Sequence, residues 1–208
     1  MTRLVLASSS PARCSLLKAA GIDPEVLIPT ADEQALSDQF KASNSNHTTS
    51  QLVQYLADAK AESVVTMQET FGALVLGGDS ALEFQGATLG KPHIAEVAIE
   101  RWKQLRGNRG VLHSGHCLID NRDPAAPKVV SKTSSTKVYF ANITDAEIEA
   151  YVATTEPLKV AGAFTIDGIG GAFIDRIEGD AHTVVGLSLG VVRDLCGQLG
   201  VEYTSLWR

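Results

Sequence analysis

Apolar residues follow two patterns along the chain. Short apolar runs such as 4–7 and 73–78 predict buried strands, and spacings of three and four residues predict helices. Together they indicate an α/β fold. The expected strands are 4–7, 73–78, 111–120, 128–141 and 172–177, and the expected helices are 11–20, 50–68, 96–105, 144–152 and 187–199.

No repeat or linker divides this pattern, so we expect a single domain over residues 1–208. The strands 111–120 and 128–141 are joined by a Pro-containing segment, which indicates an antiparallel hairpin with a longer loop. The segment 37–50 is rich in Ser, Asn and Thr, and it is the best candidate for a mobile loop.

The turn after the first strand carries the first candidate chemistry. Ser10 is suited to cap the following helix, and Pro11 is suited to its first position. Backbone N–H groups, the hydroxyls of Ser8 and Ser10 and the guanidinium of Arg13 would then form a phosphate cradle. An ordinary capped turn without a ligand is the alternative.

Charge, hydropathy and cysteine spacing argue against several classes of protein. The formal net charge of −6 argues against a general nucleic-acid binder, which needs a basic face. No apolar run reaches the length of a membrane span, and the first residues lead directly into a strand, so we expect a cytoplasmic protein. Cys14, Cys117 and Cys196 have no metal-type spacing and favour reduced thiols.

Four charged positions suggest catalysis, each with a plain alternative. Asp79 follows an apolar run, where α/β sheets present functional groups, but it could also cap a turn. Asp32 and Glu33 could supply oxygen ligands to Mg²⁺ or Mn²⁺, or could form a solvated acidic pair. Lys60 lies among small residues in a predicted helix and could equally be a solvated charge.

Several blocks of the chain together resemble the Maf family of nucleotide pyrophosphatases. Their order and spacing follow the family over nearly the whole chain. The blocks are Ala7-Ser8-Ser9-Ser10-Pro11-Ala12-Arg13, Asp32-Glu33, Ala59-Lys60-Ala61, Gly77-Gly78-Asp79-Ser80, Leu89-Gly90-Lys91-Pro92, Glu156-Pro157, Ala161-Gly162-Ala163-Phe164, Gly179-Asp180 and Val184-Val185-Gly186-Leu187.

The resemblance implies a mixed sheet flanked by helices, with two lobes around a cleft. It implies hydrolysis of nucleoside triphosphates, including modified ones, to the monophosphate and pyrophosphate with a divalent cation. Asp79 would be the proton acceptor and a metal ligand with Glu33, and Lys60 and Lys91 would contact phosphates or the leaving group. The alternative is a nucleotide-binding regulator of septum formation without turnover, and a homodimer is left open.

The chain departs from the family pattern at several positions. Ala12 replaces an Arg and Val160 stands where a Lys is usual, and both positions bear on substrate choice. Ser188 replaces a Pro, a change that concerns only local backbone stiffness. Asp167 stands where thymidine- and uridine-type members usually carry Gln. A carboxylate only accepts hydrogen bonds, so we expect Asp167 to favour guanine-type or modified purine triphosphates over dTTP and UTP. Its alternative role is to cap the turn at Gly168.

The remaining polar motifs carry less weight. His113 and His116 have an odd spacing in a predicted strand, so they are poorly placed to share a metal ion. The glycines of Gly168–Gly171 lack the strand–turn–helix context of a dinucleotide site. A hydrolase triad of Ser8, Asp180 and His182 lacks a nucleophile elbow, and we do not favour it.

Overall fold

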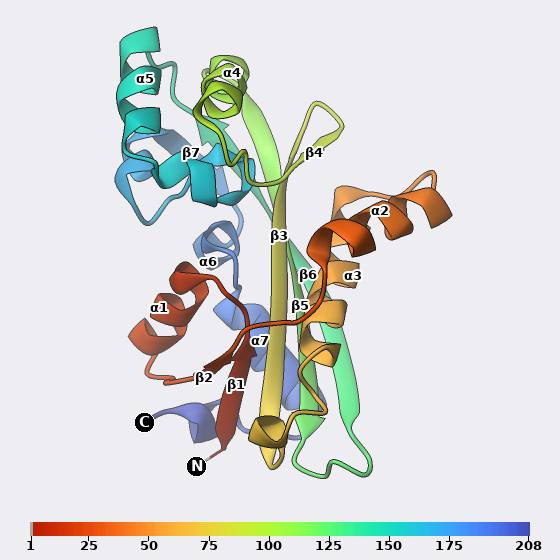
Figure 1. Ribbon diagram of the computed structural model, residues 1–208. Helices are drawn as coiled ribbons and strands as arrows, with labels where there is room; N and C mark the ends of the chain where they lie inside the picture. The colour runs from red at the N-terminus through yellow and green to blue at the C-terminus, as the bar shows by residue number, and fades with distance from the viewer. Residues whose placement is uncertain (1) are drawn as a thin grey trace. The chain divides into compact units, whose positions relative to one another are not determined.

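The computed structural model describes residues 2–208 and contains one seven-stranded sheet (Figure 1). Six strands follow the order β2-β1-β3-β5-β6-β7, and β4 pairs with β3. β1 runs parallel to β2 and β3, whereas β4 and β7 run antiparallel to their neighbours, so the predicted mixed sheet is confirmed. The strands are β1 (Arg3–Ala7), β2 (Glu25–Leu27), β3 (Ala73–Phe84), β4 (Ala87–Leu89), β5 (Arg109–Asn121), β6 (Lys128–Phe140) and β7 (Ile174–Glu178).

Seven α-helices accompany these strands in the described residues. They are α1 (Pro11–Ala19), α2 (Glu33–Ser43), α3 (Thr49–Glu62), α4 (Ala95–Leu105), α5 (Asp145–Ala153), α6 (Ala181–Val185) and α7 (Leu189–Gln198). The predicted capping box of α5 is confirmed, because Thr144 and Glu147 each accept a hydrogen bond from the other's backbone N–H. The predicted helix 96–105 and the hairpin strands are also found.

The chain forms two compact units. The first comprises 1–79, 114–134 and 186–208, and the second comprises 80–113 and 135–185. Strands β3, β5 and β6 each contribute residues to both units. The expected single domain over 1–208 and the expected cleft stay predictions.

The first unit has three layers (Figure 1). Alternate residues of β1 face opposite sides of the sheet, as strand geometry requires. Leu4 and Leu6 pack with residues of α1 and α7, whereas Val5 and Ala7 pack on the side of α3. Both faces of β1 are therefore buried, which explains why residues 4–7 form a continuous apolar run.

The second unit has its own apolar core. Trp102 of α4 is fully buried and its ring contacts Phe140, Tyr151 and Phe173 edge-on. Its indole N–H donates to the carbonyl of Ala163 at 2.7 Å, so the polar atom of this large side chain is satisfied. This cluster fixes α4 and α5 against the sheet.

The prediction of a mobile loop over 37–50 is wrong, because most of this segment is helical. α2 extends to Ser43, and Thr48 already caps α3. Asp32 caps α2 by accepting a hydrogen bond from the N–H of Ala35 at 3.1 Å. Phe40 of α2 stacks on Tyr55 of α3 with 4.7 Å between ring centroids. These contacts between helices outweigh the poor helix propensity of the Ser-rich stretch.

Three predicted boundaries also need correction. The strand expected at 73–78 continues to Phe84, so Asp79 lies within β3 and not at its end. The helix expected over 50–68 ends at Glu62. The strand expected over 172–177 begins at Ile174, after a 3-10 helix over Ile169–Phe173. Such boundaries depend on pairing partners that local sequence does not specify.

Among residues 2–208, no helix combines the length and the apolar character needed to cross a bilayer.

Candidate active site

The turn between β1 and α1 has the predicted capping geometry. Ser10 is the N-cap, its Oγ accepts from the N–H of Arg13 at 3.4 Å, and Pro11 occupies the first helical position. Ser8 is 3% exposed, and its Oγ accepts from the N–H of Ser10 at 3.1 Å. The two hydroxyls thus order the start of α1.

Arg13 is buried against the chain segment that precedes α7. Its Nε donates to the carbonyl of Gly186 at 2.8 Å, and its Nη1 donates to Oγ of Ser8 at 3.2 Å. Burial lowers the pKa of the Arg13 guanidinium from its ordinary value, and the negative charges of Asp79 and Glu33 oppose that shift. Arg13 is therefore an oriented cation near two carboxylates, and Gly186 is its partner that the sequence did not predict.

Gly77 and Gly78 lie where other parts of the protein approach β3 closely. A Cβ on Gly78 would lie 3.3 Å from Nε of Arg13, and a Cβ on Gly77 would overlap the carbonyl oxygen of Ala57 in α3. These glycines let the buried guanidinium and the helix backbone approach β3 closely.

Lys60 joins the acidic residues that the sequence singled out. Its Nζ lies 2.6 Å from Oδ1 of Asp79 and 3.1 Å from Oε2 of Glu33. The Lys60 side chain is only 7% exposed, whereas that of Glu33 is 51% exposed. The alternative of a solvated lysine is wrong, because a buried ammonium requires such partners.

The same two carboxylates fit a divalent cation that also binds phosphate. Glu33 and Asp79 both approach Lys60 Nζ, and their oxygens are the ligand type that Mg²⁺ and Mn²⁺ prefer. Within residues 2–208, no group of three or more His, Cys, Asp or Glu side chains could hold a metal ion. Glu33 and Asp79 could thus supply two oxygen ligands to such a cation.

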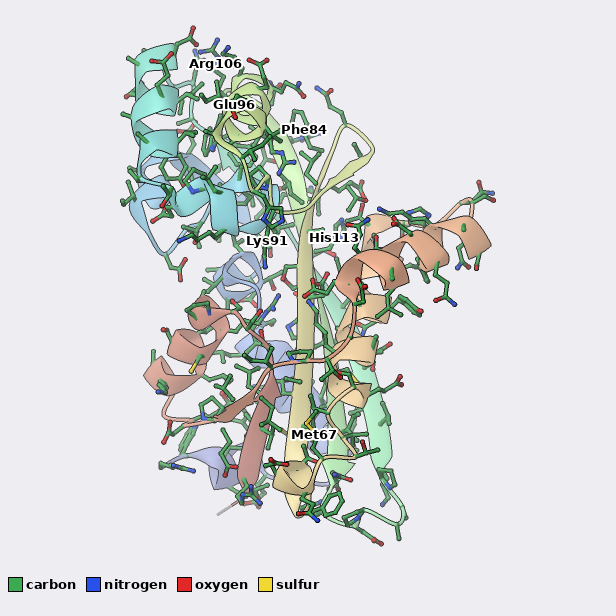
Figure 2. All side chains as sticks on the ribbon, in the orientation of Figure 1. Met67, Phe84, Lys91, Glu96, Arg106 and His113 are labelled. Carbon is green, nitrogen blue, oxygen red and sulfur yellow. The ribbon has the colours of Figure 1, made fainter. Side chains whose placement is uncertain are left out.

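Lys91 and Asp167 belong to the second unit. Figure 2 shows Lys91 on the loop between β4 and α4, where it is exposed. The hydroxyl of Thr165 donates to Oδ1 of Asp167, and the N–H of Asp167 lies 3.4 Å from that hydroxyl oxygen. The side chain of Asp167 is thus held in one orientation by a neighbour two residues away.

Glu156 orders the turn that follows Asp167, and the sequence suggested no role for it. Its carboxylate accepts from the N–H groups of Ile169 and Gly170, each at 2.9 Å, and from the hydroxyl of Tyr151 at 2.9 Å. Burial and the adjacent negative charge of Glu156 raise the pKa of Tyr151. The Glu156-Pro157 block was the sequence signal that could have indicated this role, but the backbone partners of Glu156 are 13 and 14 residues away.

The fold and the first unit's site define an α/β protein with two buried cations beside two carboxylates, a chemistry suited to a polyphosphate. The sequence matches the family described as "Maf-like protein" over residues 3–199. The chain belongs to the Maf family, as its sequence blocks indicated.

Relatives of similar length share the whole chain. A protein of Leifsonia xyli subsp. xyli is 52% identical over 207 residues, covering 99% of this chain and 96% of the relative. A Streptomyces avermitilis protein is 50% identical over 205 residues, covering 99% of this chain and 94% of the relative. A Corynebacterium diphtheriae protein is 46% identical over 204 residues, with 98% of each covered. All three are named nucleoside triphosphate pyrophosphatase.

Solved structures show a weaker likeness. The Staphylococcus aureus Ham1 protein has a TM-score of 0.40 at 17% identity, with 99% of this chain and 94% of that chain covered. A nucleoside-triphosphatase, dITP/XTP pyrophosphatase, from Mycobacterium abscessus has a TM-score of 0.39 at 11% identity. The match covers 96% of this chain and 97% of that chain.

Proposed function

We propose that this protein is a nucleoside triphosphate pyrophosphatase. It hydrolyses the bond between the α and β phosphates and releases a nucleoside monophosphate and pyrophosphate. The observation that carries the proposal is the contact of the buried Lys60 ammonium with both Glu33 and Asp79. Family membership and the names of relatives that cover nearly the whole chain support the same activity.

The first unit supplies residues suited to bind the phosphates. Arg13 is charged, fixed by Gly186 and Ser8, and suited to contact phosphate oxygens through its planar guanidinium. Lys60 is a compact cation that would neutralise charge developing on the leaving pyrophosphate. The resemblance assigns Lys91 to a contact with a phosphate or the leaving group.

Asp79 is the proposed general base. Its Oδ1 is bonded to Lys60, which fixes the carboxylate, and its Oδ2 would accept the proton of the attacking water. Glu33 and Asp79 would hold Mg²⁺ or Mn²⁺, and the bound cation would neutralise phosphate charge and lower the pKa of coordinated water. Metal dependence is part of the proposal.

Several further expectations belong to the same proposal. The substrate is a nucleoside triphosphate and not nucleic acid, the protein acts in the cytoplasm without a membrane partner, and a homodimer is left open. A nucleotide-binding regulator of septum formation is the alternative function. The paired Asp79 and Lys60 favour the enzyme, because a binding protein does not require a base.

One experiment tests the activity. The protein is incubated with ordinary and modified triphosphates in Mg²⁺ or Mn²⁺, and the products are separated by chromatography. We expect a monophosphate and pyrophosphate, with no turnover in excess chelator. Orthophosphate as the sole primary product would exclude cleavage between the α and β phosphates, and full activity in chelator would exclude the metal. Nucleotide binding without turnover would favour the regulator.

A further inference from the structure

His116 is a buried histidine of β5 whose two ring nitrogens have different partners. Nδ1 lies 3.1 Å from the carbonyl oxygen of Lys132, and Nε2 lies 2.8 Å from the backbone nitrogen of Ser188. A carbonyl only accepts and an N–H only donates, so Nδ1 carries the hydrogen and Nε2 is the acceptor. The imidazole is therefore neutral and its tautomer is defined by these contacts.

The bond to Ser188 fixes the segment that holds Arg13. Ser188 is the N-cap of α7, and its Oγ accepts from the N–H of Val191 at 3.2 Å. Gly186 lies two residues earlier and has a φ of +112°, a conformation that other residues rarely adopt. Its carbonyl accepts from Nε of Arg13 at 2.8 Å. A short run of backbone thus connects the imidazole to the guanidinium.

We propose that His116 is a positioning residue for Arg13. Its neutral imidazole holds the N–H of Ser188, which fixes the carbonyl of Gly186 and directs the guanidinium of Arg13 toward the triphosphate. His116 does not touch the substrate. The proposal rests on the proposed function for the role of Arg13, whereas the link from His116 to Arg13 is independent of it.

Two substitutions separate the two hydrogen bonds of His116. In His116→Gln, the side-chain oxygen can take the place of Nε2 and accept from Ser188. In His116→Asn, the shorter amide can take the place of Nδ1 and donate to Lys132, but it leaves the N–H of Ser188 without its acceptor. The two variants are a matched pair, because each introduces one carboxamide and each preserves one of the two bonds.

Steady-state kinetics with the triphosphate that the wild type hydrolyses best provide the first readout. A weakened ground-state contact raises KM and leaves kcat unchanged. We expect KM to rise about tenfold in His116→Asn, the effect of one lost hydrogen bond, and to change less than about threefold in His116→Gln. Equal KM values in the two variants, or a loss confined to kcat, would overturn the proposal.

The second readout does not depend on activity. Exchange of the Arg13 Nε hydrogen with solvent is measured by NMR in the full-length protein without nucleotide, and the signal is assigned with Arg13→Lys. We expect slow exchange in the wild type and His116→Gln, and exchange at least about tenfold faster in His116→Asn. Equal exchange rates would overturn the link from His116 to Arg13, even if the wild type hydrolyses triphosphates.

These readouts distinguish the two proposals. If the wild type hydrolyses no triphosphate, the proposed function fails and the exchange measurement still decides whether His116 positions Arg13. If His116→Asn does not fold, as judged by circular dichroism, His116→Leu replaces it, because leucine fills the space and offers neither a donor nor an acceptor. The expected exchange rate and the contradicting outcome are then the same.

Discussion

Lys60 on α3 and Asp79 on β3 meet at 2.6 Å in the interior of the first unit. The contact forms because α3 lies directly against β3 at Gly77, two residues before Asp79, where a side chain would overlap the helix backbone. The helix also carries Lys60 within 3.1 Å of Glu33. The close contact of α3 with β3 therefore accompanies the meeting of Lys60 with both carboxylates.

Replacing the proposed base tests its role directly. Asp79→Asn keeps the shape and one acceptor oxygen but can neither take a proton nor balance the charge of Lys60. We expect turnover to fall by about 100-fold or more, with nucleotide binding largely retained. Turnover and calorimetric binding are the measurements. Retention of about a third or more of wild-type turnover would assign Asp79 to a structural role.

A methyl group at Gly77 should separate Lys60 from Asp79. In Gly77→Ala the Cβ would lie 2.9 Å from Cβ of Ala61 and would overlap the carbonyl of Ala57, so α3 must shift. We expect a loss of about 1–3 kcal/mol in the free energy of unfolding. We also expect at least about a tenfold fall in kcat/KM, because the reacting groups are misplaced.

Gly197→Ala is the matched control for this substitution. Gly197 lies in α7, and a Cβ there would have no atom within 4 Å. The same change should stabilise the protein slightly, by up to about 1 kcal/mol, and leave kcat/KM unaltered. Denaturant unfolding and initial rates measure both variants. Equal behaviour of the two alanine variants would show that the close approach at Gly77 is not required.

The three free cysteines should differ in reactivity. Burial raises the pKa of the Cys117 thiol to about 12 and that of Cys196 to about 11, whereas Cys14 is partly exposed. The thiolate is the reactive form, so near pH 8 iodoacetamide should modify Cys14 first. Mass spectrometry of the folded and the denatured protein is the measurement. Fast labelling of Cys117 in the folded protein would contradict the burial of β5.

Base preference tests the role of Asp167. Its carboxylate would accept from the adjacent N–H groups of guanine and would repel the carbonyl oxygens of thymine and uracil. We expect kcat/KM for guanine-type or modified purine triphosphates to exceed that for dTTP and UTP by at least about tenfold, with the difference reduced in Asp167→Asn. A preference for dTTP or UTP that is unchanged in Asp167→Asn would show that Asp167 does not recognise the base.

Local patterns predicted much of the fold. Ser10, Pro11 and the capping box at Thr144 act over three or four residues, and both helix starts are found where the pattern places them. The Ser-rich segment 37–50 was wrongly predicted to be a mobile loop. Its helix α2 is stabilised by the stacking of Phe40 on Tyr55, which lie 15 positions apart in the sequence. Local composition does not encode a contact of that range.

The sequence by itself determined the α/β class, the family and the chemical types of the candidate residues, because these depend on residue identity and short spacings. The tertiary structure alone decided which of them meet. Lys60 is bonded to a carboxylate 19 residues away and Arg13 to a carbonyl 173 residues away. Such partners are chosen by the packing of helices on the sheet and by the need to satisfy buried charges, which act through space and leave no local pattern in the chain.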